Sequence, residues 1–302
     1  MRWLSDHIEA LRGLLESGHS YRDVAERLSD EWGVDLTWDN VRNAARRNQI
    51  RSKAQPATPP NVERYDKCFR LSGDWAIVGD LHSPFTDWGL AGQVGGQAQK
   101  HDIDRLLVAG DAFEFAGYSR YAALVPSCTQ GDEQAGVRYM IDVWRETFKE
   151  IRFISGNHDA RLMKLLNGTI PADTIEALFM SLLGNPANVH YSLYHYAIID
   201  TPQGEWRITH PQNYSRNALA VARKLAHKYR QHIACLHVHH SATGIDDSGQ
   251  FVIADIGCLA DPQKLAWTSL FDSASTPVMN QGFALLKDGK LRNYSNHPAM
   301  WN

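Results

Sequence analysis

Short apolar runs that each end in a polar residue recur through most of this chain and constrain its fold more than any other feature. We expect strands at residues 75–80, 105–111, 151–157, 196–200, 206–210, 232–238 and 251–257. Stretches with helical periodicity lie between them, at residues 132–150, 173–183 and 215–230. The alternation predicts a layered α/β fold, and two late runs, GFALLKD and KLRNYS, indicate a second sheet.

The polar residues at the ends of these runs are the types that bind divalent metals. They are Asp80, His82, Asp111, Asn157, His158, Asp159, His210, His237 and His239. A lone Asp in such a place is often a helix N-cap, but ordered recurrence at strand ends, where open sheets build their sites, favours one metal site. On an extended strand the rings of His237 and His239 would face the same side and could reach different ions. Oxygen and imidazole ligands without thiolates suit Mn²⁺, Fe²⁺ or Zn²⁺.

Composition excludes several classes of protein. The chain has 302 residues and a net charge of −3, so as a whole it is not a polycation that would coat nucleic acid or anionic lipid. No apolar run approaches the roughly 18 residues that span a bilayer, so we expect no membrane partner. Asp6 and Glu9 interrupt the N-terminal stretch where a signal peptide would be apolar, which favours a cytoplasmic protein. Four widely spaced cysteines without a CxxC pair indicate neither a disulfide framework nor a zinc ribbon.

Residues 5–50 carry the local signals of three short helices. Ser20 and Asp23 form a capping-box pattern before the second helix, and Thr37 precedes the third. The third helix and the residues after it are basic, with no acidic residue from position 40 to position 62. A basic face suits a phosphate backbone. The residues that we expect to contact DNA are Arg42, Asn43, Arg46, Arg47 and Arg51.

The segments GHSYRDVAERL and LTWDNVRNAARR resemble the small helix-turn-helix DNA-binding domains of regulators and phage proteins, over roughly residues 3–52. The resemblance implies DNA as a partner. The alternative is a three-helix module for protein interaction or oligomerisation with a solvated basic face. The first 53 residues hold nine basic and nine acidic side chains, so the segment is polarised rather than basic. Proline-bearing residues 54–64 are a predicted linker, and the expected domains are residues 1–53 and 65–302.

The motifs D-x-H, G-D, G-N-H-D, a single His and H-x-H follow one another over about residues 75–260. This order resembles the calcineurin-like metallophosphoesterase superfamily. The local sequences GDLHSPF, GDAFEF with YSR, GNHDARL and NQGF look like its branch common in phages and their bacterial hosts. The resemblance implies a metallophosphoesterase fold, a layered β-sandwich flanked by helices, here after a small all-α domain. A phage-encoded chain of this kind would act in the host cytoplasm.

The resemblance also implies two divalent metal ions. Mn²⁺ is the ion expected first, and Fe²⁺, Zn²⁺ and Ni²⁺ are the alternatives. One ion would be held by Asp80, His82 and His239. The other would be held by Asn157, His210 and His237, and Asp111 would bridge the two. A hydroxide between the ions would attack phosphorus, and His158 would act as the general acid that protonates the leaving oxygen.

Two positions depart from the family's pattern. Glu114 stands where the family often has an Asp that orients the general acid, so we expect it to orient His158. Leu236 stands where the family usually has Gly; an extended strand should accommodate it, although its side chain can narrow the metal pocket. The candidate substrate contacts are Arg161, Tyr118 and Arg120. A surface ion pair is the alternative for either Arg.

These features predict a metal-dependent hydrolase of phosphate esters, first of all a phosphodiesterase or nuclease that acts on DNA. One alternative is a phosphomonoesterase that acts on phosphoproteins or nucleotides, because the same metal core serves both reactions across the superfamily. A second alternative is a non-catalytic DNA-binding regulator with a phosphoesterase scaffold. A set of seven ligand positions disfavours the scaffold. The metal, the substrate and the oligomeric state stay open.

Overall fold

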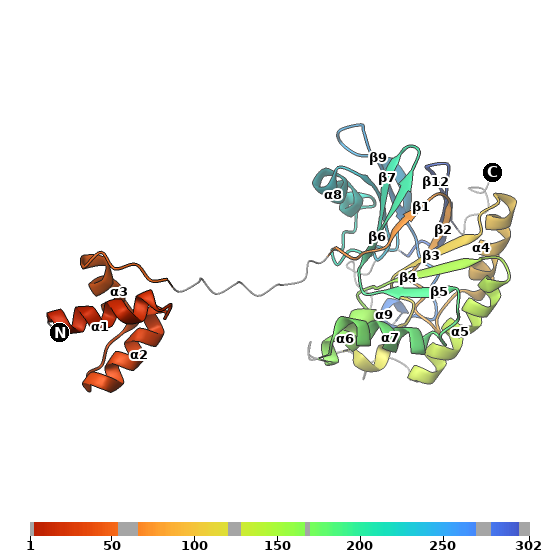
Figure 1. The fold of residues 1–302 in the computed structure, drawn as a ribbon. Helices are drawn as coiled ribbons and strands as arrows, with labels where there is room; N and C mark the ends of the chain where they lie inside the picture. The colour runs from red at the N-terminus through yellow and green to blue at the C-terminus, as the bar shows by residue number, and fades with distance from the viewer. Residues whose placement is uncertain (1–2, 54–65, 120–127, 167–169, 270–278, 296–302) are drawn as a thin grey trace. The chain divides into compact units, whose positions relative to one another are not determined.

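The computed structural model of the chain describes residues 3–53, 66–119, 128–166, 170–269 and 279–295 (Figure 1). By contacts, the chain divides into two compact units, residues 1–64 and residues 65–302. The expected linker, residues 54–64, lies outside the described residues. No helix in the described ranges combines the length and the apolar character that crossing a bilayer requires.

The first unit contains three helices whose ends follow from local sequence. They are α1 (Ser5–Glu16), α2 (Tyr21–Trp32) and α3 (Trp38–Arg47). The Ser20 hydroxyl accepts from the backbone N–H of Asp23, and Thr37 makes the same bond to Asn40, so both predicted capping positions are confirmed. Buried apolar residues from all three helices form the core of this unit, among them Leu11, Leu15, Val24, Leu28, Val41 and Ala45.

The strands described in the second unit form two sheets of six. One sheet has the order β1 (Arg70–Ser72), β6 (Tyr196–Thr201), β7 (Gly204–Thr209), β8 (His232–Cys235), β10 (Val252–Ile256) and β9 (Ser241–Ile245). The other has the order β12 (Lys290–Ser295), β11 (Gly282–Lys287), β2 (Trp75–Val78), β3 (Arg105–Ala109), β4 (Glu150–Ile154) and β5 (Val189–Ser192). Strands β2 to β5 are parallel, whereas β11 pairs with β2 antiparallel.

Alternation along the strands builds four layers. Trp75 and Ile77 of β2 pack between the two sheets, together with residues of the other sheet such as Trp206. Ala76 and Val78 point the other way, into the core beneath the helices. Helices α4 (Trp88–Lys100), α5 (Gln130–Arg145) and α7 (Ala172–Leu182) cover that outer face. Helix α8 (Ala220–Tyr229) covers the outer face of the first sheet (Figure 1).

The expected fold class, a layered α/β sandwich flanked by helices after a small helical segment, is confirmed. The expectation that the two late runs begin a second sheet is wrong. They form β11 and β12, which extend the sheet of β2, because Ala284 and Leu285 pair with Ile77 and Ala76. The second sheet is built from earlier segments, including strand β1, which sequence patterning missed.

Candidate metal centre

The metal-ligand residue types meet where strands of both sheets end. Strands β2, β3 and β4 are followed by Asp80 with His82, by Asp111, and by Asn157 with His158. Strands β7 and β8, which are parallel to each other in the other sheet, are followed by His210 and by His237 with His239. Neighbouring parallel strands end at the same edge, so each sheet contributes one side of a shared site.

Most of these residues have an unusual backbone. Left-handed φ angles between 47° and 72° occur at Asp80, His82, Asp111, His237 and His239. This region is unfavourable for residues with a side chain and persists where surrounding contacts impose it, as it often does at functional sites.

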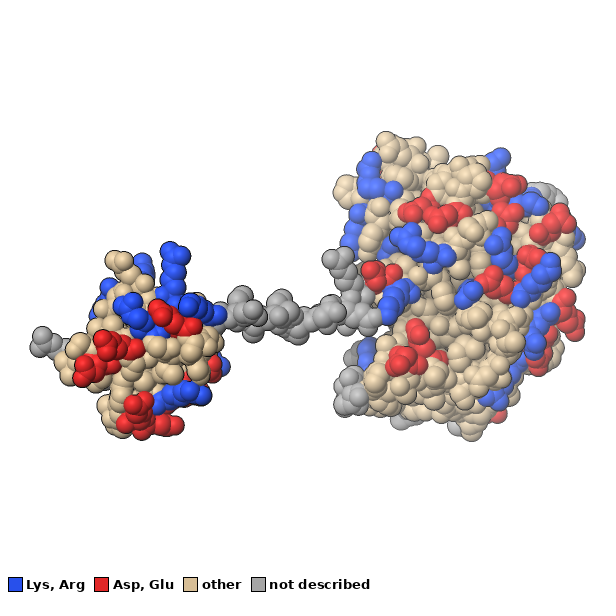
Figure 2. All heavy atoms as spheres, in the orientation of Figure 1, with Lys and Arg blue, Asp and Glu red and all other residues tan. Residues whose placement is uncertain are grey.

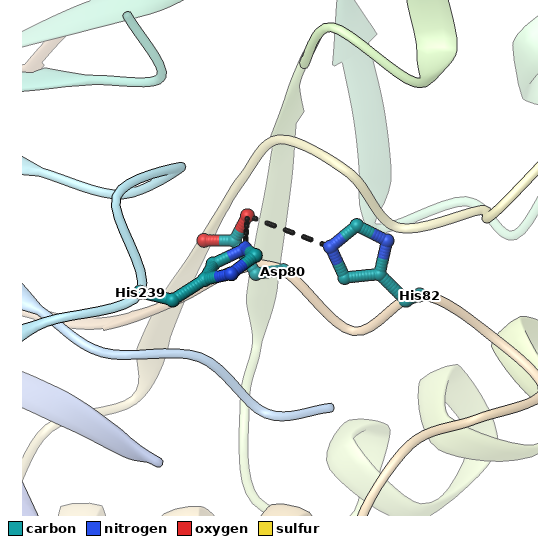
Figure 3. A group of neighbouring side chains, drawn as sticks. All are labelled: Asp80, His82 and His239. Atoms are coloured by element: carbon teal, nitrogen blue, oxygen red, sulfur yellow. Dashed lines mark hydrogen bonds and ion pairs between the residues drawn. The ribbon is translucent and has the colours of Figure 1, made fainter. Parts of the chain in front are cut away.

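The first group of side chains contains Asp80, His82 and His239, all at most 5% exposed. His239 Nε2 lies 3.1 Å from Asp80 Oδ1, and His82 Nε2 lies 3.8 Å from the same oxygen (Figure 3). Both rings are directed at one carboxylate, and one ligand atom from each residue lies within 4.8 Å of the others.

The second group contains Asp111, His210 and His237, again with one ligand atom each within 4.8 Å. His210 Nδ1 lies 3.0 Å from the carbonyl oxygen of Ala109, so it donates its proton there and presents Nε2 to the site. That Nε2 lies 3.2 Å from Asp111 Oδ2 and 3.0 Å from Asn157 Oδ1, which brings Asn157 to this group.

A divalent ion fits these groups. Among the described residues, the buried His82 Nε2 has no hydrogen-bond partner, although it faces the Asp80 carboxylate. Its other nitrogen, Nδ1, lies 2.7 Å from Glu114 Oε2, an arrangement that fixes the ring as metal-ligating histidines are usually fixed. The donors are nitrogen and oxygen only, a set that suits borderline divalent ions.

Ionisation explains why the carboxylates and imidazoles of these groups attract one another. Burial raises the pKa values of the Asp80 and Asp111 carboxyls, but the charges of neighbouring histidines, His210 among them, outweigh it and hold both below their ordinary value. Burial lowers the pKa of His82, yet the carboxylates of Asp80 and Glu114 raise it to about 10. Against the effect of burial, the carboxylate of Asp111 likewise raises the pKa of His210 to about 9. The ionised carboxylates therefore favour the protonated forms of His82 and His210, and a divalent ion would bind in competition with those protons.

Glu114, His158 and Arg161 form a third cluster beside the ligands. His158 Nδ1 lies 3.0 Å from the Glu114 carbonyl oxygen and 3.2 Å from Glu114 Oε2. The Arg161 guanidinium donates to the Glu114 carbonyl oxygen at 2.8 Å, and its other amino group lies 2.9 Å from His158 Nε2. A guanidinium only donates, so His158 Nε2 accepts and the ring proton is on Nδ1.

The expected extended strand through His237 and His239 is wrong. Strand β8 ends at Cys235, and the two left-handed residues turn the chain instead. The backbone N–H of His237 donates to Asp80 Oδ2 at 2.9 Å, which helps to impose this turn. Leu236 does not narrow the pocket by lining it: its side chain is buried between the sheets, against Gly79.

The candidate substrate contact Tyr118 makes its contacts with residues other than the metal ligands. The Tyr118 hydroxyl donates to Gln130 Oε1 at 2.7 Å, and its ring packs beside Phe115. Arg120 lies outside the described residues. The sequence did not indicate the contact of Glu114 with His82, nor that Asp159 Oδ2 accepts from the N–H of Gly156, because neither residue's partner follows from periodicity.

The basic residues of the first unit lie on its surface. Arg46, Arg47 and Arg51 are exposed, and basic side chains gather on the upper part of this unit in Figure 2. Arg42 is also exposed but pairs with Asp39 at 2.8 Å. Asn43 is half-buried and donates to Asp39 Oδ2 at 3.0 Å. Arg46, Arg47 and Arg51 are therefore open to solvent, whereas Asn43 is partly buried and bonded to Asp39.

Comparison with known proteins gives likenesses of structure. No family model matches the sequence, and no curated protein matches it. Vps29 from Chaetomium thermophilum is similar over 74% of this chain and 88% of its own, with 11% identity and a TM-score of 0.39. A dimetal phosphatase from Danio rerio is similar over 74% and 95%, with 10% identity and a TM-score of 0.38. Yfce, a phosphoesterase from E. coli, is similar over 72% and 91%, with 11% identity and a TM-score of 0.36. Such likenesses concern the fold and not the activity.

Proposed function

We propose that this chain is a phosphoesterase that depends on two divalent metal ions and hydrolyses phosphodiesters of DNA. The observation that carries the proposal is the pair of His and Asp groups, buried except for the half-buried His237, each with three ligand atoms within 4.8 Å of one another. Asp80, His82 and His239 would hold one ion. Asp111, Asn157, His210 and His237 would hold the other, with Asp111 as the bridge. Two bound divalent ions would polarise phosphoryl oxygens and lower the pKa of water, Mn²⁺ being the first choice.

The chain's own residues supply orientation and a proton. Glu114 holds His158 through its carbonyl oxygen and its carboxylate. The Arg161 side chain is 22% exposed and donates a hydrogen bond to His158 Nε2. A phosphate oxygen is a stronger acceptor for a guanidinium than an imidazole nitrogen. Arg161 would move to that oxygen, and His158 Nε2 would take up a proton and deliver it to the leaving oxygen.

The basic residues of α3 support DNA as the substrate. Exposed Arg46, Arg47 and Arg51 would bind phosphates independently of sequence and raise the local concentration of DNA for the metal centre. On this proposal the N-terminal unit recruits DNA, and the second unit cuts it.

A substrate panel on the full chain tests the proposal. The metal-free protein is supplied with Mn²⁺, Fe²⁺, Zn²⁺ or Ni²⁺ and offered bis-esters, monoesters, cyclic nucleotides, and single- and double-stranded DNA. We expect hydrolysis of bis-esters and DNA. Hydrolysis of monoesters alone would reject DNA as substrate and favour a phosphomonoesterase. DNA binding without hydrolysis of any ester under any metal would reject the enzyme and favour a regulator.

A further inference from the structure

Helix α5 carries a buried carboxylate, Glu133, that belongs to neither metal group. Its residue is 2% exposed and lies in the first turn of the helix. Glu133 Oε2 accepts from the backbone N–H of Phe115 at 2.7 Å, and Oε1 accepts from that of Ala116 at 3.2 Å. These are the two residues directly after Glu114, so both oxygens hold the loop that carries Glu114.

The backbone of the same residue holds a second loop. The Ser83 hydroxyl donates to the Glu133 carbonyl oxygen at 2.8 Å, and Ser83 directly follows His82. The Glu114 N–H donates to the Ser83 carbonyl oxygen at 3.3 Å, which ties the two loops to each other. One turn later, a Cβ at Gly136 would overlap Ser83 Oγ, so α5 lies directly against this loop.

The loop that carries Glu114 depends on these contacts, because Phe115 has φ 46° and ψ 43°. The left-handed region is unfavourable for a bulky residue and persists only where contacts impose it. If Phe115 relaxed, the peptide between it and Glu114 would rotate. Glu114 would then lose its place against His82 Nδ1 and His158 Nδ1.

Glu133 has a third neighbour that favours its role as an acceptor. Cys128 Sγ lies 3.6 Å from Glu133 Oε1. Burial and the neighbouring Glu133 raise the pKa of the Cys128 thiol to about 12, so the thiol stays protonated and donates. The N-terminal end of a helix also stabilises a negative charge in its first turn.

We propose that Glu133 is a positioning residue that holds Glu114 against His82 and His158, and so sets how firmly His82 binds metal and how well His158 delivers a proton. The proposal rests on the proposed function. A purely structural role for Glu133 would differ: it would contribute to the stability of the fold without acting through Glu114.

The test is a double-mutant cycle on the full chain with Glu133→Gln and Glu114→Gln. A glutamine at position 133 keeps the shape but turns one acceptor into a donor that faces a backbone N–H. Mn²⁺ binding to the metal-free protein is measured by calorimetry, and kcat and KM are measured on the best substrate of the panel. We expect Glu133→Gln to weaken Mn²⁺ binding up to about tenfold, the low end of the effect of losing a ligand's own partner, because Glu133 acts on that partner, Glu114. We expect kcat to fall by a similar factor while KM stays within about twofold.

In the Glu114→Gln background, Glu133→Gln should change Mn²⁺ affinity and kcat by less than about twofold, because the residue that it positions is already altered. Thr129→Ala is the matched control: it removes the N-cap of α5 and lowers stability, but it should leave affinity and kcat unchanged. Ser83→Ala, which removes the second tie without altering a buried charge, should weaken Mn²⁺ binding in the same direction as Glu133→Gln.

Equal effects of Glu133→Gln in both backgrounds would overturn the proposal, as would a loss of stability alone that matches Thr129→Ala. If Glu133→Gln does not fold, Ser83→Ala decides, and unchanged Mn²⁺ affinity in that variant overturns the proposal. An unaltered chain that neither binds Mn²⁺ nor hydrolyses any ester would reject the proposed function itself, which is a different result.

Discussion

The two units of this chain position their charged and metal-ligand side chains in opposite ways. In the N-terminal unit, Arg46 and Arg47 stand exposed on a helix whose ends are fixed by neighbours three residues away, such as Thr37 and Asn40. In the second unit, most of the metal-ligand types are buried, and they come from segments more than 150 residues apart, as Asp80 and His239 do. The first arrangement depends on local caps and on the small apolar core that the three helices share. The second depends on the whole fold, so its function and its stability are coupled.

The largest effect expected from this difference is that of Asp111→Asn. Loss of the bridging charge should lower kcat at least about a thousandfold, because metal-assisted charge stabilisation contributes several kcal/mol. DNA binding by the full chain should stay unchanged in a mobility-shift assay. Asp200→Asn, an exposed change of the same type on β6, is the control. A wild-type rate in Asp111→Asn would show that the metal centre is assigned wrongly.

The second-largest expected effect is that removal of metal destabilises one unit and not the other. At an ion concentration of 100 times Kd, binding stabilises the folded state by about 2.7 kcal/mol. Chelation should therefore speed hydrogen exchange in the loops after β2, β3 and β8, and leave residues 3–53 unaffected. Exchange followed by mass spectrometry measures both. Equal acceleration in α1 to α3 would contradict the independence of the two units.

A smaller effect is expected from the paired change Arg46→Ala and Arg47→Ala. Losing two phosphate contacts should weaken DNA binding about tenfold at physiological salt and lower the salt dependence by about two ions. Hydrolysis of a small bis-ester should not change. The control pair is Arg22→Ala and Arg27→Ala, which removes the same charge from exposed positions of α2. If both pairs weaken binding equally, the face of α3 is not the DNA surface.

The smallest effect belongs to Thr37→Ala. Loss of this N-cap should destabilise the N-terminal unit by about 1 kcal/mol and speed exchange in α3. Mn²⁺ affinity, measured by calorimetry, should stay at its wild-type value. A change in that affinity would mean that the units are coupled after all.

More of the N-terminal unit than of the second unit could be predicted from sequence, because its helix ends depend on local contacts and the second unit depends on long-range ones. Ser20 and Thr37 predict where their helices begin, because the capping partner of each is three residues away. The alternating apolar runs give the layers of the second unit, although they do not say which sheet β11 joins. That depends on which edge strand is free to pair, and β2 is far away in sequence.

The candidate site was predictable to the same extent: local sequence indicated its ligands, and tertiary contacts determined the rest. The order of ligand types along the chain places Asp80 and His210 at strand ends, as expected. The left-handed turns at His237 and His239 were missed, because tertiary contacts such as the bond from His237 to Asp80 impose them. Glu133 was missed as well, since a buried glutamate in a helix has no periodic signal that distinguishes it from a solvated one.

The contact between Gly79 and Leu236 joins the segments that carry the two metal groups. Gly79 directly precedes Asp80, and Leu236 directly precedes His237, so each stands one residue before a ligand. A Cβ at position 79 would overlap Leu236 Cδ2, and the side chain of Leu236 fills the space that Gly79 leaves. The same Cβ would also approach the backbone carbonyl oxygen of Ala109, and no change at position 236 would relieve that overlap. Glycine at position 79 therefore lets the segments that carry Asp80, Asp111 and His237 lie this close together.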